Sequence, residues 1–252
     1  MTSPLRAARA AFVFLTRVPL GGFPYGPAEW RWAPAYFPFV GAVLGGVVGL
    51  AFEVLRPLGA MGAAYLALGA SLLLTGAFHE DGLADTSDAL GGAYDRAKLF
   101  VVLKDSRVGA FGACAVVVSI AGRAALLAQI DARALWALVL VGAVARAVPV
   151  WQIAALEYAT PEGSKSSDVM RAGALQAAVG AAWPLLIGVA LVVFHRVEAW
   201  RVVGVLLAAV GVGVVTAWRY KVRAGGVTGD FLGATEQLCE LAGLAVMAWS
   251  TG

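Results

Sequence analysis

The sequence predicts an all-α integral membrane protein, a polytopic helix bundle built as one domain over residues 1–252. Of its 252 residues, 60% are apolar and 14% are charged, whereas a soluble domain carries about 25% charged residues. Seven apolar stretches approach the roughly 20 residues that a spanning helix needs. They are 34–55, 57–78, 108–130, 134–156, 172–194, 202–218 and 233–250. We therefore expect the lipid bilayer to be a partner of the chain.

The segment before the first span predicts a short amphipathic helix over residues 4–17. Arg6, Arg9 and Arg17 occur there beside the aromatic side chains of Phe12 and Phe14. This mixture of basic and aromatic residues is typical of a helix that lies in the plane of the membrane surface.

Glycines recur every four residues in the first span, at Gly41, Gly45 and Gly49. This spacing lets a second helix approach closely. The pattern permits packing within one chain and, equally, a homodimer.

The distribution of basic residues predicts the orientation, because Lys and Arg accumulate in cytoplasmic loops. With the N-terminus inside, thirteen of the nineteen basic residues fall in inner segments and four in outer loops, while Arg123 and Arg146 lie inside spans. We expect a multi-pass protein of a bacterial or archaeal cytoplasmic membrane, with the C-terminus outside. The polar loops 79–107, 157–171 and 219–232 would all face the cytoplasm. The scattered basic residues do not indicate a nucleic-acid partner.

The most unusual segment is HEDGLADTSDALGG, residues 79–92. On a helix, Asp81, Asp85 and Asp88 share one face within an arc of about 60°. Clustered carboxylates are the hard oxygen ligands that Mg²⁺ or Mn²⁺ prefers, and Glu80 is a further candidate ligand. A solvated helix start is the alternative, but charge is costly at a membrane boundary, which favours the metal site. His79 is either a polar anchor at the interface or a catalytic base.

The segment LKDSRVGAFG, residues 103–112, supplies positive charge just before the third span. Arginine and lysine bind phosphate oxygens, and Gly109 and Gly112 permit close backbone approach at a helix start, where anions are favoured. Contact with lipid headgroups is the alternative for the basic side chains. The candidate substrate-binding residues here are Lys104, Asp105, Ser106 and Arg107.

The segment GGVTGDFLGATEQLCE, residues 225–240, places Asp230 after a glycine-rich turn and Glu236 and Glu240 one turn apart on the last helix. Carboxylates inside a spanning helix are costly and usually functional, so all three are candidates for binding a substrate or a second cation. Arg146, near the middle of its span, is predicted to be a counter-ion to a carboxylate or phosphate, whereas Arg123 is a candidate for a structural role. Acids for a metal and cations for phosphates together indicate phosphoryl transfer.

The chain resembles the cobalamin synthase family, the adenosylcobinamide-GDP ribazoletransferases. The matching segments occur in the family's order and cover nearly the whole chain. They are FLTRVP (14–19), FPFVGAVLG (37–45), HEDGLADTSDALGG (79–92), KDSRVGAFG (104–112) and GGVTGDFLGATEQLCE (225–240).

The resemblance implies a Mg²⁺-dependent membrane enzyme. A ribose hydroxyl of α-ribazole, or of its 5′-phosphate, would attack the phosphorus attached to cobinamide, and GMP would leave. Asp81, Asp85 and Asp88 would bind Mg²⁺, and Lys104 and Arg107 would hold the pyrophosphate. His79 or one of the carboxylates would accept the proton, and Asp230 and Glu236 would complete the metal or ribose site.

One loop departs from the family. Many members have YAR followed by GLG after the fourth span, whereas residues 158–168 here read YATPEGSKSSD. Thr160 replaces the arginine, and Lys165 is a candidate to restore the positive charge.

Two other functions remain open from the residues alone. Charged residues within spans also occur in transporters, but here the charges gather at one surface. A CDP-alcohol phosphotransferase also uses clustered aspartates, but its motif begins Asp-Gly-x-x-Ala-Arg, which DGLADTSD does not follow beyond the first two residues.

Overall fold

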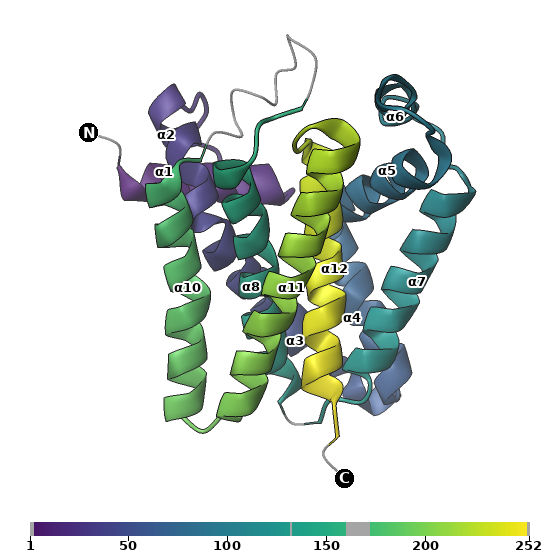
Figure 1. Cartoon of the computed structure of the whole chain (residues 1–252). Coiled ribbons are helices and arrows are strands. Elements are labelled where there is room, and N and C mark those ends of the chain that lie inside the picture. Colours follow the sequence, from purple (N-terminus) through teal and green to yellow (C-terminus); the bar gives the residue numbers. More distant parts are fainter. Residues whose placement is uncertain (1–2, 132, 160–171, 251–252) are drawn as a thin grey trace.

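A computed structural model describes residues 3–131, 133–159 and 172–250 and confirms the predicted all-α fold (Figure 1). Within these ranges there is no β-strand, only an isolated bridge between Tyr158 and Val227. The helices are α1 (Pro4–Leu15), α2 (Pro27–Trp32), α3 (Phe37–Leu55), α4 (Ala60–Thr75), α5 (Phe78–Gly92), α6 (Arg96–Val102), α7 (Ala110–Leu127), α8 (Ala134–Ala155), α10 (Ala174–Val193), α11 (Ala199–Ala224) and α12 (Gly229–Ala248). Short 3₁₀ turns precede and follow α3, at Ala33–Tyr36 and Arg56–Leu58.

Six helical segments among the described residues are long and apolar enough to cross a membrane. The predicted seventh span, 57–78, exists only if the bent pair α4 and α5 is counted as one span, since α4 alone has 16 residues. The chain breaks at Gly76 and Ala77, whose φ angles of 70° and 56° are left-handed. This break turns α5 by 91° from α4.

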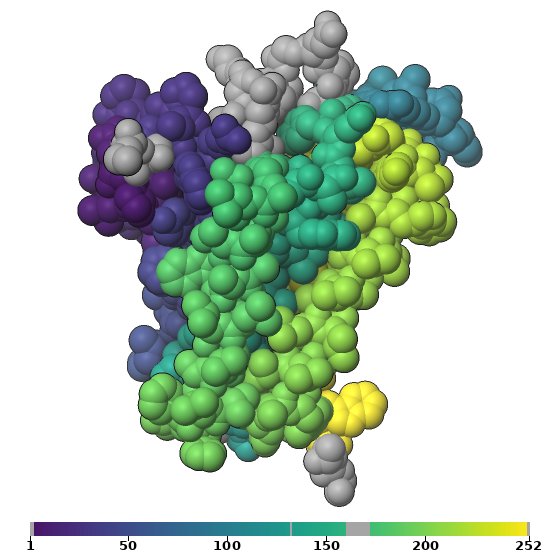
Figure 2. Space-filling view, turned by 60° about the vertical axis from the view of Figure 1, so that its left-hand side comes forward, coloured from purple at the N-terminus to yellow at the C-terminus, as the bar shows by residue number. Residues whose placement is uncertain are grey.

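The predicted amphipathic helix is present as α1, two residues shorter than expected at its C-terminal end. Its buried face consists of Ala7, Ala10, Ala11 and Leu15. Figure 1 shows α1 lying across one end of the bundle beside α2. Figure 2 shows α10 and α11 covering one face of the molecule, with the N-terminal helices beside the upper end of α10.

The glycine face of α3 packs against α8 within the same chain. A Cβ atom at Gly41 or Gly45 would overlap the carbonyl oxygen of Gly142 or Leu138. Helix α8 is the centre of the bundle and packs against α3, α10, α11 and α12. The close approach predicted from the glycine spacing is therefore confirmed, and the face that permitted a homodimer is used inside the chain.

The two ends of the bundle differ in what they carry. Figure 1 places the N-terminal helices, α5, α6 and the turn between α11 and α12 at one end, and the C-terminal end of α12 at the other. Because successive helices alternate in direction, residues 79–107 and 219–232 come together at the end of the bundle that carries the N-terminus.

Candidate active site

Helix α5 carries the acidic segment across the end of the bundle. Asp81 is exposed, whereas Asp85 and Asp88 are half-buried on the same face of the helix. Asp230, in the first turn of α12, joins them because the two helices cross closely. A Cβ atom at Gly82 would lie 2.8 Å from the carbonyl oxygen of Asp230.

Like charges accumulate where α5 meets α12. Asp85 is within range of electrostatic repulsion from Asp81, Asp230 and Asp88. Among the described residues, no basic side chain forms an ion pair with Asp81, Asp85 or Asp230. We call these three residues the acidic face. Their mutual repulsion without a basic partner is the arrangement that a bound cation relieves.

Asp88 has a different local role. One carboxylate oxygen accepts a hydrogen bond from the backbone N–H of Gly109 at 2.7 Å, and the other accepts one from Gly112 at 2.9 Å. The carboxylate therefore caps the N-terminus of α7, where negative charge is favoured. The anion at this helix start is thus Asp88 itself, and the contact fixes the 103–109 loop beside the acidic face.

Arg107 and Asp105 form a two-point ion pair in that loop. The guanidinium Nε and Nη2 donate to the two carboxylate oxygens at 2.9 and 2.6 Å, and the backbone N–H of Arg107 adds a bond of 3.1 Å. These hydrogen bonds lower the pKa of Asp105 to about 2. The Arg107 side chain remains 86% exposed, and Lys104 and Ser106 are exposed. The loop therefore presents its cations to solvent at the end of the bundle that carries the acidic face.

A second charged cluster lies inside the bundle, with Arg123 of α7 at its centre. The guanidinium is 2% exposed and pairs with Glu80 of α5 at 3.0 Å and with Glu240 of α12 at 2.7 Å. The sequence made Arg123 a candidate for a structural role, and in the structure it connects α5, α7 and α12. Glu80, predicted as a metal ligand, points to this arginine.

Arg146 of α8 extends the cluster along α12. Its Nη1 lies 2.8 Å from Glu236 and 3.0 Å from Glu240, so the predicted counter-ion role for Arg146 has carboxylate partners. His79 is 5% exposed, with its Nδ1 3.9 Å from Glu236. We call Glu80, Arg123, Arg146, Glu236 and Glu240 the buried ion-pair network. Each carboxylate in this network contacts at least one arginine, and such pairing makes the burial of charge within spanning helices tolerable.

The structure thus separates residues that the sequence groups together. His79 and Asp81 are two positions apart on α5, which puts them about 200° apart around the helix. His79 faces Glu236 and Arg146, whereas Asp81 belongs to the acidic face. Arg107 lies in the 103–109 loop that Asp88 anchors. The roles predicted for these residues stay predictions, but His79 and the acidic face do not converge in this conformation.

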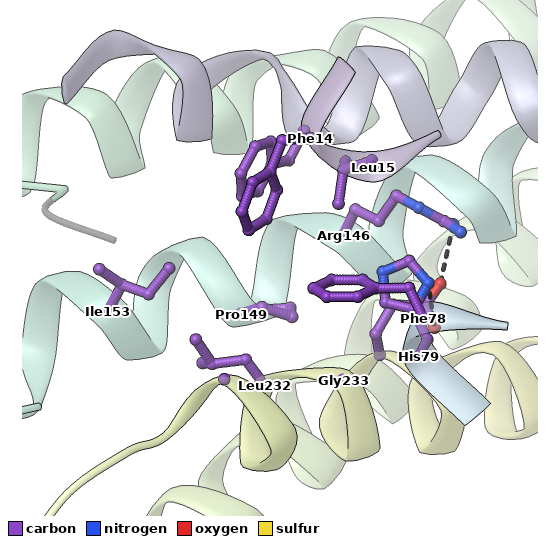
Figure 3. Close-up of a pocket in the computed structure, with 12 residues that line it drawn as sticks. Phe14, Leu15, Phe78, His79, Arg146, Pro149, Ile153, Leu232 and Gly233 are labelled. Carbon is purple, nitrogen blue, oxygen red and sulfur yellow. Dashed lines mark ion pairs between the residues drawn. The ribbon is translucent and has the colours of Figure 1, made fainter. Parts of the chain in front are cut away.

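A narrow pocket reaches the buried ion-pair network from beneath α1 (Figure 3). Arg146, His79 and Glu236 form its polar end, and its apolar walls include the rings of Phe14 and Phe78. It offers about 30 Å³ to water-sized molecules, which is room for about one water. Two aromatic residues that line it, Phe37 and Phe78, were given no role from the sequence, although Phe37 begins the FPFVGAVLG segment and Phe78 directly precedes His79.

The oxygen donors of the acidic face fit a divalent cation in chemical type. No three side chains of His, Cys, Asp or Glu in the described parts of the chain converge as a complete protein site. Magnesium usually takes one or two carboxylates together with substrate phosphates and water. The acidic face meets that smaller requirement, with Lys104 and Arg107 in the neighbouring loop available for the phosphates.

The divergent loop begins at a fixed point beside the turn that precedes α12. The N–H of Ala159 donates to the carbonyl of Val227 at 2.8 Å, and the N–H of Val227 donates to the carbonyl of Glu157 at 2.9 Å. Thr160 and Lys165 lie outside the described residues.

Comparison with known proteins gives a consistent family. The model of the CobS family, described as cobalamin-5-phosphate synthase, matches residues 7–248. A protein of Leptothrix cholodnii named adenosylcobinamide-GDP ribazoletransferase is 36% identical over 272 residues, covering 100% of this chain and 98% of the relative. Proteins of the same name from Allorhizobium ampelinum and Rhizobium etli are 39% and 37% identical, covering 93% and 94% of each chain. No solved structure matches the chain.

Proposed function

Because the chain belongs to the cobalamin-5-phosphate synthase family, we propose that it is a Mg²⁺-dependent transferase of cobalamin assembly. Its substrates are adenosylcobinamide-GDP and α-ribazole or α-ribazole 5′-phosphate. The products are adenosylcobalamin or its 5′-phosphate, and GMP.

The observation that carries this proposal is the acidic face, three carboxylates without a basic partner among the described residues. Because magnesium usually takes one or two carboxylates, we assign Asp81 and Asp85 as the side chains that hold Mg²⁺, with the carboxylate of Asp230 adding negative charge beside them. When bound, Mg²⁺ supplies positive charge to the diphosphate of adenosylcobinamide-GDP. Asp88 holds the start of α7 and the cationic loop in place beside this site.

Lys104 and Arg107 bind and orient the pyrophosphate. Arg107 has an exposed guanidinium that is already positioned by Asp105, so little side-chain entropy is lost when it meets a phosphate. Both cations stabilise the negative charge that develops on the departing GMP.

The reaction forms one P–O bond and breaks another. A hydroxyl oxygen of ribazole attacks the phosphorus that carries cobinamide, and the bond from this phosphorus to the bridging oxygen breaks. GMP leaves with that electron pair. The hydroxyl proton passes to a base, for which the geometry favours a carboxylate of the acidic face, because His79 points to the other side of α5.

We place the acidic face at the cytoplasmic side of a bacterial or archaeal cytoplasmic membrane. The sequence concentrates its basic residues in segments that include α6 and the end of α11, and Figure 1 shows both at the same end of the bundle as α5. Labelling of Ser106→Cys in intact cells by a membrane-impermeant maleimide would contradict this orientation.

The test is turnover by the purified protein in lipid nanodiscs. Adenosylcobinamide-GDP, α-ribazole and Mg²⁺ are supplied, and GMP and adenosylcobalamin are quantified together. We expect equal amounts of both products, and we expect chelation of Mg²⁺ to stop the reaction. Asp81→Asn should lower kcat/KM at least about 100-fold, since metal-ion stabilisation contributes several kcal/mol.

Asp131→Asn is the matched control. Asp131 is exposed at the opposite end of the bundle and pairs with Arg133, so its removal should leave turnover unchanged. Product formation that continues without any divalent cation, or that survives Asp81→Asn, would refute the metal role.

A further inference from the structure

A large pocket separate from the acidic face lies on the opposite side of α5. It has a volume of about 450 Å³ and is bounded by α5, α7, α11 and α12. Leu83 and Leu90 of α5 line it, and both lie about 180–200° around the helix from Asp81. Its volume is within the range of small-molecule sites, about 300–1,000 Å³.

The sides of this pocket belong to two candidate spanning helices. Val118 of α7 and Val215 of α11 line it, and their side chains are 64% and 62% exposed. Exposed valines on spanning helices face hydrocarbon, so the pocket opens sideways into the bilayer. Its walls suit an acyl chain.

The pocket also contains polar groups that lack partners. Arg219 of α11 lines it and forms no ion pair within the described residues. Thr86 of α5 lines it too, is 5% exposed, and its hydroxyl has no hydrogen-bond partner among the residues described. A buried donor without an acceptor is costly, so this wall is suited to a ligand with acceptor oxygens.

The position of Arg219 along α11 corresponds to the level of lipid headgroups. It lies five residues before the end of the helix at Ala224. Arg223, one turn nearer the end, is already engaged, because it donates to the carbonyl oxygens of Leu90 at 3.3 Å and Ala93 at 2.6 Å. Arg219 is therefore the cation at this pocket that is free to bind an anion.

We propose that this pocket binds one membrane glycerophospholipid. The acyl chain fills the apolar space beneath α5, the phosphate binds Arg219, and an ester carbonyl accepts the hydrogen bond of Thr86. If Arg219 only made nonspecific contacts with lipid headgroups, neither the large pocket beside it nor the unpartnered hydroxyl of Thr86 would be explained. The bound lipid supports α5 from the side opposite to the acidic face.

The test is native mass spectrometry of the full chain in detergent. The protein is loaded with phosphatidylglycerol at limiting concentration and delipidated, and the lipid that remains bound is then measured. We expect one phospholipid to survive delipidation on the wild type. Ala115→Leu adds volume inside the pocket, Arg219→Gln removes the charge, and Thr86→Val removes the hydroxyl while keeping the shape. Each should lower lipid occupancy, Arg219→Gln at least about tenfold, as expected for a lost charge-assisted hydrogen bond.

Two variants serve as matched controls. Ala113→Leu adds the same volume on an exposed position of α7, and Arg196→Gln removes an exposed arginine at the other end of the molecule. Both should retain the lipid. Equal occupancy on the wild type, Ala115→Leu and Thr86→Val, or no lipid retained by the folded wild type, would overturn the proposal. Neither result depends on turnover, so the lipid site and the enzymatic activity are tested separately.

Discussion

Individual acidic side chains fall into two groups according to their partners. Glu80, Glu236 and Glu240 each pair with a buried arginine, whereas Asp81 and Asp85 have no basic partner among the described residues. Each member of the first group is paired within the chain and links one helix to another. The second group retains its charge for a ligand, which is why the catalytic proposal rests on it.

Removing Arg123 should destabilise the protein strongly. Arg123→Gln leaves Glu80 without a charge partner inside the bundle and leaves Glu240 with Arg146 alone, and breaking a buried ion pair from one side costs about 3–5 kcal/mol. The free energy of unfolding, measured by titration with a denaturing detergent in bicelles, should fall by this amount. The double variant Arg123→Gln with Glu80→Gln should recover part of the loss, because one buried carboxylate charge is removed.

Arg133→Gln provides the comparison for an exposed pair. Arg133 contacts Asp131 at 3.0 Å and Glu198 at 2.6 Å, both of which are largely exposed. Exposed pairs contribute about 0–1 kcal/mol, so the unfolding free energy should change by no more than this. Equal losses for Arg123→Gln and Arg133→Gln would show that the network is not a buried, cooperative unit.

At the scale of helices, glycine positions decide which elements meet. The face of α3 that carries Gly41 and Gly45 contacts the backbone of α8 directly. By contrast, a Cβ atom at Gly69 of α4 would have no other atom within 4 Å. The four-residue glycine spacing of α3 predicts this close approach, and Gly69 has no glycine four residues away. The spacing does not say that α8 is the partner.

Gly45→Ala should therefore cost stability that Gly69→Ala does not. The added methyl group at Gly45 meets the Leu138 carbonyl, and overpacking of this kind costs about 1–3 kcal/mol. At Gly69 alanine fills open space and improves helix propensity. The same detergent titration measures both variants. A loss at Gly69 as large as that at Gly45 would contradict the packing of α3 on α8.

The helical periodicity predicted much of the fold because it follows from local chemistry. Apolar length predicted the long helices, and the i, i+4, i+7 spacing correctly placed Asp81, Asp85 and Asp88 on one face of α5. The break at Gly76 and Ala77 was missed because the apolar run continues through it, although left-handed φ angles end α4 there. The sequence also did not predict which helices pack against one another. The capping of α7 by Asp88 and the central place of Arg123 depend on which helices cross.

At the scale of the whole molecule, alternating helices bring three distant polar segments to one end. Residues 79–92, 103–109 and 225–230 lie there together, while the buried ion-pair network joins α5, α7, α8 and α12 beneath them. The network thus supports the end of the bundle where the proposed chemistry occurs. The lateral pocket adds a second support for α5 from the bilayer side.

Mn²⁺ binding, measured by electron paramagnetic resonance on the purified protein with adenosylcobinamide-GDP present, tests the central claim most directly. Manganese takes the same oxygen ligands as magnesium and is visible to the method. We predict that the wild type and Asp131→Asn bind Mn²⁺, whereas the double variant Asp81→Asn with Asp85→Asn loses the bound signal while keeping its fold. Undiminished Mn²⁺ binding by the double variant, or no binding by the wild type, would contradict the assignment of the acidic face as the cation site.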